Sequence, residues 1–483
     1  VIRVEDTYYM VSTTMHFMPG CEILQSFDLV HWEHVTYVYE TLDHTDAQQL
    51  KSGQNIYGQG MWAASLRYHE GRFYICFVAN DTRKTYLYTS EKIDGPWKKQ
   101  LIEGFYHDGS LLFDEDGRNY IVYGNDEIWI TELNEDLTAP KKDGLHRLLV
   151  SDHKNPELGY EGSHIQKING YYYIFLVHSL RDRWMRTEAC FYSDSLEGEF
   201  TGGDVLCDDR GYCGQGVAQG GIVDTPDGKW YAMLFQDSGA VGRIPILLPV
   251  TWKDHFPFFG QNGHVPEEIE VHSTRPGYIY QPLVGSDDFC NGLLPRWQFN
   301  HDPDPRYYHL DALQGTYTIT TREVCTELTQ AVNTLTQRMS YPSCAAEVTV
   351  DASALKEGDV AGLCALQSCY AAVGITKHHG KYEVLMLDKK EDGILDMTEG
   401  TVVESHQMDF RLEADFCNMK DEARCYYRVN KGDWLPIGNV HKLYFKLDHF
   451  TGCRFGLFCY AAEETGGSAC FRDFKYYDVD EIS

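Results

Sequence analysis

The chain has 483 residues, with 72 acidic and 42 basic side chains, which gives a formal net charge of −30 at pH 7. Such an acidic surface repels phosphate backbones and anionic lipid headgroups, so the composition argues against nucleic-acid and membrane-surface roles. Apolar runs such as IPILLPV fall far short of the ~20 residues that a membrane-spanning helix requires.

The first half of the chain repeats one plan, in which a short apolar strand, a turn and an aromatic-led strand follow one another. In chain order the five copies are VIRVEDTYYMVS, SLRYHEGRFYICFVA, SLLFDEDGRNYIVYG, SHIQKINGYYYIFLVH and GIVDTPDGKWYAMLFQ. The turns HEGR, DEDGR, INGY and PDGK predict two-residue β-hairpins. A repeat of roughly 45 to 65 residues favours a five-bladed β-propeller over residues 1–255, whereas a plain sandwich rarely repeats its hairpins so regularly.

A Pro- and Gly-bearing connector is expected at residues 256–285. After it come short alternating runs, including GTYTITT, CAAEVTV, YEVLML, CYYRV and RFGLFCY. These runs predict a second all-β domain, most simply a β-sandwich, over residues 286–483. The expected fold class is therefore all-β, a five-bladed propeller followed by a C-terminal sandwich.

Cysteine usage indicates the compartment. The 15 cysteines form no CxxC pair, and several lie in strand-like apolar runs, such as Cys76 in YICFVA and Cys459 in GLFCYA. They are interpreted as buried, reduced thiols, which predicts a cytoplasmic protein. The chain opens on Val1 without a methionine, so we expect native residues upstream of it.

The repeat also serves as a ruler for functional residues. Trp62, Asp108, Glu161 and Gln219 each lie eight residues before the corresponding turn residue of their hairpin, and small residues follow each one, in WAAS, DGSL, EGSH and QGGI. Equivalent positions of a radially repeated fold occupy equivalent places, so these four side chains are predicted to ring one axial site. A lone glutamate at a strand end would be a solvated charge. Two carboxylates, a tryptophan and an amide that converge on one channel instead indicate a catalytic site.

Paired carboxylates beside an aromatic platform suit glycoside hydrolysis. One carboxyl must stay protonated to donate to the leaving oxygen, and a nearby ionised carboxylate raises the pKa of that acid. The other essential group is a base or a nucleophile on the opposite face of the sugar. Neither a GxSxG elbow nor a P-loop occurs, so serine hydrolysis and phosphoryl transfer lack motif support.

The motifs MWAASLRYHEGRFYICF, HDGSLLFDEDGRNYIVYG, YEGSHIQKINGYYYIF and AQGGIVDTPDGKWYAMLFQDSGAVGRIPILLPVTW resemble glycoside hydrolase family 43. The resemblance is to its two-domain β-xylosidase and α-L-arabinofuranosidase branch, and LKEGDVAGLCALQ resembles that branch's concanavalin A-like C-terminal domain. It implies an inverting exo-glycosidase that releases terminal xylose or arabinofuranose from xylo- or arabino-oligosaccharides of hemicellulose. No cofactor is expected to be required, and a homo-oligomer is compatible with the sequence.

The resemblance implies a role for each matching residue. Glu161 matches the general acid of an E-G-P-H-like motif, and Asp108 matches the aspartate of a D-P-S-L-F-like motif, which orients the acid and tunes its pKa. Trp62 matches the tryptophan of W-A-P that lines the sugar subsite. Arg243, in AVGRIP, matches an arginine that binds sugar hydroxyls.

Other positions depart from the pattern of the family. Gln219 stands where many relatives have a histidine near the axis, and Phe17 lies near a substrate-contacting aromatic, with Met15 as its competitor. The family's general base is an aspartate in D-P-S, expected just upstream of Val1. The alternative function is therefore a non-catalytic pentoside-binding propeller. A retaining fructan-processing enzyme ranks third, because neither R-D-P nor E-C occurs.

Two acidic segments resemble calcium loops. FDEDG at 113–117 is interpreted as a hairpin turn, while HDPDPR at 301–306 fits either a solvated loop or a structural calcium site on the sandwich. The histidines beside the carboxylates, His107 and His164, show no metal-ligand spacing, so metal binding in the channel is left open.

Overall fold

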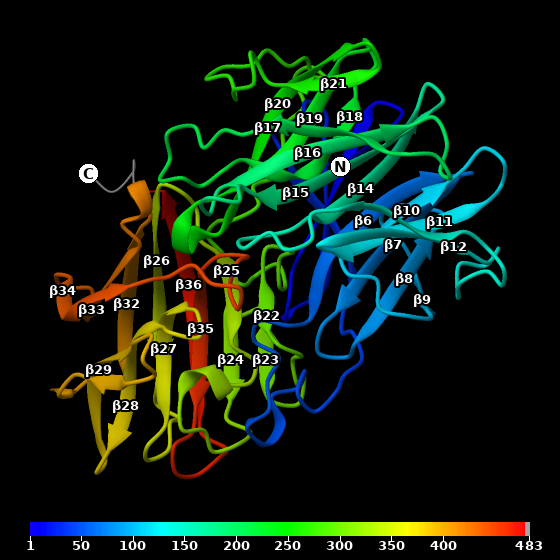
Figure 1. Ribbon diagram of the computed structural model, residues 1–483. Coiled ribbons are helices and arrows are strands. Elements are labelled where there is room, and N and C mark those ends of the chain that lie inside the picture. The colour runs from blue at the N-terminus through cyan, green and yellow to red at the C-terminus, as the bar shows by residue number, and fades with distance from the viewer. Residues whose placement is uncertain (479–483) are drawn as a thin grey trace.

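The computed structural model describes residues 1–478, which form a five-bladed propeller and a two-sheet sandwich (Figure 1), and this confirms the expected fold class. The first two blades are β1 (Ile2–Val4), β2 (Thr7–Ser12), β4 (Gly20–Ser26) and β5 (Glu33–Tyr39), then β6 (Met61–His69), β7 (Arg72–Ala79), β8 (Lys84–Ser90) and β9 (Lys98–Ile102). The third is β10 (Ser110–Phe113), β11 (Asn119–Asn125), β12 (Glu127–Leu133) and β13 (His146–Ser151). The fourth and fifth are β14 (Glu161–Ile168), β15 (Tyr171–Ser179), β16 (Arg186–Ser193) and β17 (Thr201–Leu206), then β18 (Ala218–Asp224), β19 (Trp230–Asp237), β20 (Arg243–Lys253) and β21 (Phe256–Phe259).

The sandwich packs a nine-stranded sheet on a seven-stranded one. The larger sheet holds β3 (Phe17–Met18), β22 (Gln298–Asn300), β25 (Leu335–Arg338), β27 (Val360–Leu366), β28 (Ala371–His378), β29 (Lys381–Lys389), β30 (Leu395–Met397), β31 (Thr401–Val403) and β35 (Arg454–Tyr460). The smaller sheet holds β23 (Tyr308–Asp311), β24 (Thr316–Thr320), β26 (Ser343–Asp351), β32 (Gln407–Asp415), β33 (Glu422–Val429), β34 (Leu435–Lys442) and β36 (Ser468–Asp478).

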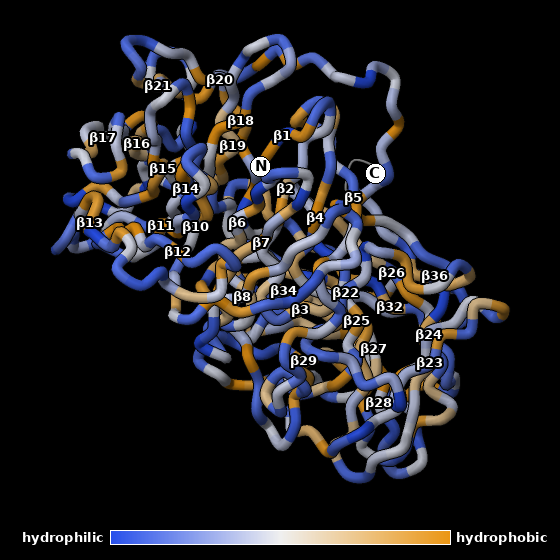
Figure 2. Tube along the Cα trace, turned by 90° about the vertical axis from the view of Figure 1, so that its right-hand side faces the viewer, coloured by the Kyte–Doolittle hydropathy of each residue, from blue (hydrophilic) through white to orange (hydrophobic). Residues whose placement is uncertain are grey.

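Helices contribute little to the fold. The four in residues 1–478 are single 3-10 turns at Lys51–Gly53, Gly239–Val241, Leu328–Gln330 and Cys417–Met419. None of them has the length or the apolar character to cross a membrane. Apolar residues concentrate along the strands and polar residues along the loops, as the hydropathy colouring of Figure 2 shows.

The hairpin prediction holds in part. Blades two and four turn over two residues, Glu70–Gly71 and Asn169–Gly170, all four with positive φ. In blades three and five the turns are wider and span residues 114–118 and 225–229, so the two-residue prediction is wrong there. Each wider loop is closed by a hydrogen bond between the backbone groups of its first and last residues, which makes a longer turn stable.

One partly buried arginine links three inner strands. Arg67 of β6 donates from Nε to the Leu111 carbonyl (2.9 Å), and from Nη2 to Ser110 Oγ (2.6 Å) and the Ile165 carbonyl (3.0 Å). Burial lowers the pKa of Arg67 to about 10. The guanidinium therefore joins blades two, three and four near the channel through its fixed fork of donors.

We expect Arg67→Lys to lower the free energy of unfolding by about 2–4 kcal/mol. Lysine cannot reproduce the fork of donors, so it would leave buried acceptors without a hydrogen-bond partner. Thermal and urea unfolding measure the loss. Arg72→Lys, on the exposed side of a hairpin, is the matched control and should change little. Equal stability of the two variants would contradict the tie between blades.

The two domains are linked by a short strand that comes from the propeller half of the chain and pairs with the sandwich sheet. β3 leaves the first blade and pairs with β22 of the sandwich, with Met18 opposite Phe299 and Phe17 opposite Asn300. The propeller ring closes elsewhere, where Arg3 of β1 donates to the Asp224 carbonyl of β18 (3.1 Å).

Candidate active site

The innermost strands begin with distorted backbone at the channel. β-Bulges follow Trp62, Glu161 and Ala218, and Asp108 and Gln219 have positive φ. A bulge re-aims the side chain beside it, and bulges are enriched next to functional sites. The small residues that follow each key position in the sequence are therefore where the inner strands bend.

The structure brings the two predicted carboxylates together around a histidine. His107 Nε2 lies 3.6 Å from Glu161 Oε2 and 3.7 Å from Asp108 Oδ1. Asn125 Nδ2 donates to Glu161 Oε2 at 2.7 Å. The amide of Gly124 donates to the His107 carbonyl at 3.1 Å, which fixes the backbone of the cluster.

Burial and mutual charge set the protonation of this cluster. Burial raises the pKa of Asp108 to about 6, with His107 opposing the rise and the Glu161 charge adding to it. Burial alone would lower the pKa of His107, but the carboxylates of Glu161 and Asp108 raise it to about 9. The cluster therefore holds protons near neutral pH, as an acid–base site requires.

The predicted arginine and tryptophan lie beside a wall supplied by the other domain. Arg243 Nε donates to Asp237 Oδ1 at 3.2 Å, and its guanidinium lies between the rings of Phe235 (4.5 Å) and Phe450 (4.2 Å). Phe450, from the sandwich loop before β35, also meets Trp62 edge-on, with 5.2 Å between ring centroids. Burial chiefly lowers the pKa of Arg243 to about 10.

Gln219 also reaches the inner ring. Its backbone amide donates to Glu188 Oε2 at 2.7 Å, and its side chain lies against Gly162, where an added Cβ would come within 2.8 Å of Gln219 Cγ. Glu188 is fully buried, and that burial raises its pKa well above the usual range. Glu188 thus holds the start of β18, where Gln219 packs against the neighbour of Glu161.

The structure does not bring Phe17 to this cluster, which corrects the expectation that it contacts the sugar. Phe17 is fully buried on β3 inside the sandwich sheet, and the Arg454 guanidinium lies 3.7 Å from its ring centroid. Strand pairing with β22 packs it among apolar residues of the sandwich, such as Leu366 and Phe458. Met15, its competitor, is also fully buried, and its backbone pairs with that of Met61, the neighbour of Trp62.

Sequence reasoning missed Asn125, Glu188, Asp237 and Phe450. Asp237 lies within the quoted FQDSGAVGR stretch, six residues before Arg243, so its pairing with that arginine could have been proposed. Asn125 and Glu188 carry no signal in the repeat, because each meets its partner only across neighbouring blades, and Phe450 comes from the sandwich.

Metal binding has one geometric candidate within residues 1–478. Ligand atoms of His107, Asp108 and Glu161 lie within 4.8 Å of one another, so one nitrogen and two oxygens could share a divalent ion. In the calcium-like segments, Asp114 pairs with Lys167 (2.6 Å) and Asp304 with Arg306 (2.7 Å). A structural calcium at residues 301–306 stays a prediction, with a solvated loop as its alternative.

Two protein-family models together match most of the chain. The model described as glycosyl hydrolases family 43 matches residues 1–257, and that of the beta xylosidase C-terminal concanavalin A-like domain matches residues 286–477. The chain is 26% identical over 539 residues to a beta-xylosidase of Formosa agariphila, covering 99% of this chain and 86% of that protein. It is 23% identical over 420 residues to a non-reducing end alpha-L-arabinofuranosidase of Bacteroides ovatus, covering 82% and 77%. A solved bifunctional GH43-CE structure from Bacteroides eggerthii superposes with a TM-score of 0.91 at 42% identity; it covers 99% of this chain, which spans 62% of that protein.

Proposed function

This chain belongs to glycosyl hydrolases family 43, and we propose that it is an inverting exo-glycosidase that releases terminal xylose or arabinofuranose from hemicellulose oligosaccharides. The observation that carries the proposal is the meeting of Glu161 and Asp108 with Trp62 and Arg243 at the inner strand ends. The names of the relatives from Formosa agariphila and Bacteroides ovatus, a xylosidase and an arabinofuranosidase, support the two pentoses.

Glu161 is the proposed general acid. Asn125 and His107 engage its Oε2, which leaves Oε1 as the oxygen that can face the glycosidic bond. Asp108 and Glu161 both lie beside His107, and Asp108 is proposed to orient the acid through this shared neighbour. Trp62 and Phe450 offer apolar faces to the sugar ring, and the Arg243 guanidinium offers donors to its hydroxyls.

The general base is proposed to be the aspartate that the family resemblance places upstream of Val1. In an inverting enzyme it activates a water on the far face of the sugar, with carboxyl groups roughly 6.5–9.5 Å apart. We also propose a cytoplasmic location, because all fifteen cysteines are free thiols.

The test compares the printed chain with one that carries its native upstream residues. Both are assayed on aryl β-D-xyloside and aryl α-L-arabinofuranoside, and NMR of the released sugar reports the anomeric outcome. Turnover by the extended chain alone, with inversion, is the expected result. Binding of pentosides without cleavage by the extended chain would replace the enzyme with the pentoside-binding propeller.

Phe450→Ala should lower kcat/KM for the aryl pentosides by about 10-fold, because it opens the wall between Trp62 and Arg243 to water. Phe450→Leu, which keeps most of the apolar volume, should retain more activity. Steady-state kinetics of both variants test this, and unchanged kinetics for Phe450→Ala would show that the sandwich does not complete the site.

A further inference from the structure

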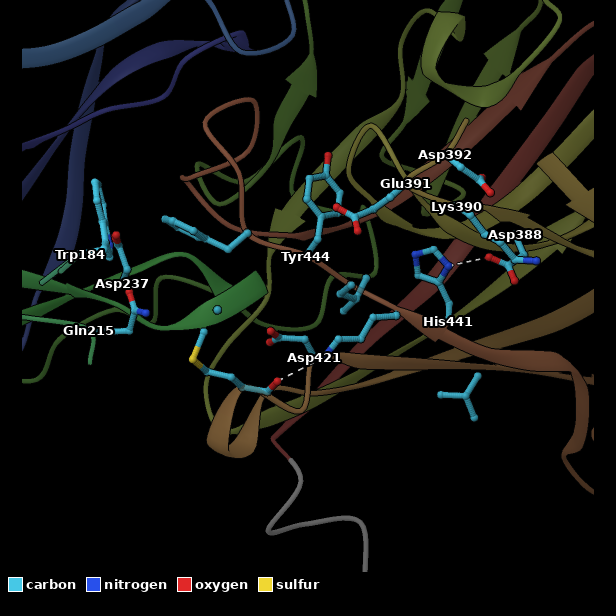
Figure 3. Close-up of a pocket in the computed structure, with 16 residues that line it drawn as sticks. Trp184, Gln215, Asp237, Asp388, Lys390, Glu391, Asp392, Asp421, His441 and Tyr444 are labelled. Carbon is cyan, nitrogen blue, oxygen red and sulfur yellow. Dashed lines mark hydrogen bonds and ion pairs between the residues drawn. The ribbon is translucent and has the colours of Figure 1, made fainter. Parts of the chain in front are cut away.

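A cleft of about 920 Å³ lies between the propeller and the sandwich (Figure 3). On the propeller side it is lined by Trp184, in the loop between β15 and β16, and by Asp237. The sandwich side presents the turn between β29 and β30 and the end of β34. At its base, Asp421 of the sandwich accepts a hydrogen bond from the Ala240 amide of the propeller (3.0 Å). Such a volume suits a ligand of several rings.

A stack of aromatic rings and guanidinium groups connects this cleft to the sugar subsite. From the Phe235 ring, which the Arg243 guanidinium covers at 4.5 Å, the stack continues to Arg186 (5.3 Å) and then to the Trp184 ring (5.7 Å from that guanidinium). Arg186 also pairs with Asp237 at 3.5 Å, as Arg243 does at 3.2 Å. This stack therefore lies between the wall of the catalytic site and the cleft.

One side chain in the cleft has an unused hydrogen-bonding atom. His441 is 3% exposed, and its Nδ1 lies 2.7 Å from the Asp388 carboxylate, which fixes the proton on Nδ1. Nε2 has no partner among residues 1–478, and Figure 3 shows that side of the ring turned away from Asp388. Burial lowers the pKa of His441, so Nε2 is an acceptor that awaits a donor.

The remaining chemistry of the cleft is also rich in acceptors. Asp392 lies in the turn after β29 together with Glu391, whose carboxylate pairs with Lys446 at 2.5 Å, and Trp184 is 44% exposed at the opposite rim. Acceptors opposite an aromatic face match a ligand with many hydroxyl donors and apolar ring faces. Two lysines, Lys390 and Lys442, also line the cleft. They are outnumbered by five carboxylates, those of Asp237, Asp388, Glu391, Asp392 and Asp421, and the excess negative charge disfavours an anionic ligand.

We propose that this cleft binds the leaving-group side of the substrate, a neutral, hydroxyl-rich oligosaccharide chain that stacks on Trp184 and donates to His441. The inference rests on the proposed function and extends it: the enzyme removes terminal pentoses from chains of several sugars and disfavours chains that carry uronic acid groups near the cleaved end.

The experiment compares substrates of different length. Trp184→Ala should lower kcat/KM on xylotetraose about tenfold, mainly through KM, and leave an aryl β-D-xyloside within about twofold, because the aryl group is too short to reach the cleft. The double variant Glu391→Gln, Asp392→Asn should improve turnover of a uronic-acid-bearing xylo-oligosaccharide relative to xylotetraose. Phe258→Ala, an exposed aromatic on β21 outside the cleft lining, is the matched control.

A binding measurement keeps this inference separate from the proposed function. Calorimetric titration of Glu161→Gln with xylotetraose, with and without Trp184→Ala, reports the cleft even if no substrate is cleaved. Loss of affinity with Trp184→Ala supports the cleft. Three outcomes would overturn the proposed cleft. Trp184→Ala could affect both substrates equally, or it could change neither the kinetics nor the affinity. The third is tighter binding of a linear polyamine than of the oligosaccharide.

Discussion

Glu161→Gln in the chain with its native upstream residues should lower kcat/KM on pentosides with poor leaving groups by about 10³-fold or more. The amide keeps an oxygen for Asn125 and nearly the same volume, so the geometry of the cluster survives while the transferable proton is lost. A dinitrophenyl leaving group hardly needs protonation, so its hydrolysis should fall much less. Steady-state kinetics on a series of aryl xylosides measures the difference.

The exposed Glu157→Gln controls for the change of charge and should leave the kinetics unchanged. Substrate affinity of Glu161→Gln should stay near the parent value, because the change removes chemistry rather than contacts. A uniform loss across all leaving groups would assign Glu161 to binding, and full activity would remove it from the mechanism.

Asp108→Asn should lower kcat/KM about 10²-fold and at the same time stabilise the fold at pH 8 by about 1–2 kcal/mol. Burial raises the pKa of Asp108 from 3.8 to about 6. For an acid with a raised folded pKa, the unfolding free energy is highest below pH 3.8 and falls as the pH rises through 6. The asparagine removes that loss, although His107 gives up a partner.

The measurement is a pair of chemical unfolding series for parent and variant between pH 5 and pH 8. The stability gain of Asp108→Asn should grow as the pH rises from 5 through the folded pKa of about 6 and should level off above it. A variant that is less stable at pH 8 would show that the His107 contact outweighs the cost of burying the charge.

The propeller could be predicted because each blade repeats its own local pattern. Hairpin turns such as Asn169–Gly170 signal themselves, and the fixed spacing from turn to inner strand placed Trp62, Asp108, Glu161 and Gln219 near the axis. The side-chain directions could not be predicted, because they depend on bulges that the sequence shows only as small residues.

The rest of the site depends on contacts between distant parts of the chain. Phe450 reaches Trp62 from the sandwich, and no local pattern marks a loop residue that packs on another domain. A long-range contact also decides the position of Phe17, but it keeps this residue out of the site, because pairing with β22 draws it away from the first blade. Asn125 meets Glu161 only through the register between blades.

The pairing of β3 with the sandwich has a consequence for folding during synthesis on the ribosome. Phe17 and Met18 are translated before the rest of the propeller, whereas their partners Phe299 and Asn300 are translated only after it. The first blade thus waits with an unpaired, apolar segment while synthesis continues, the kind of exposure that chaperones guard. A propeller expressed without the sandwich would carry that exposed segment permanently, so its poor yield would reflect a missing strand partner rather than an unstable ring.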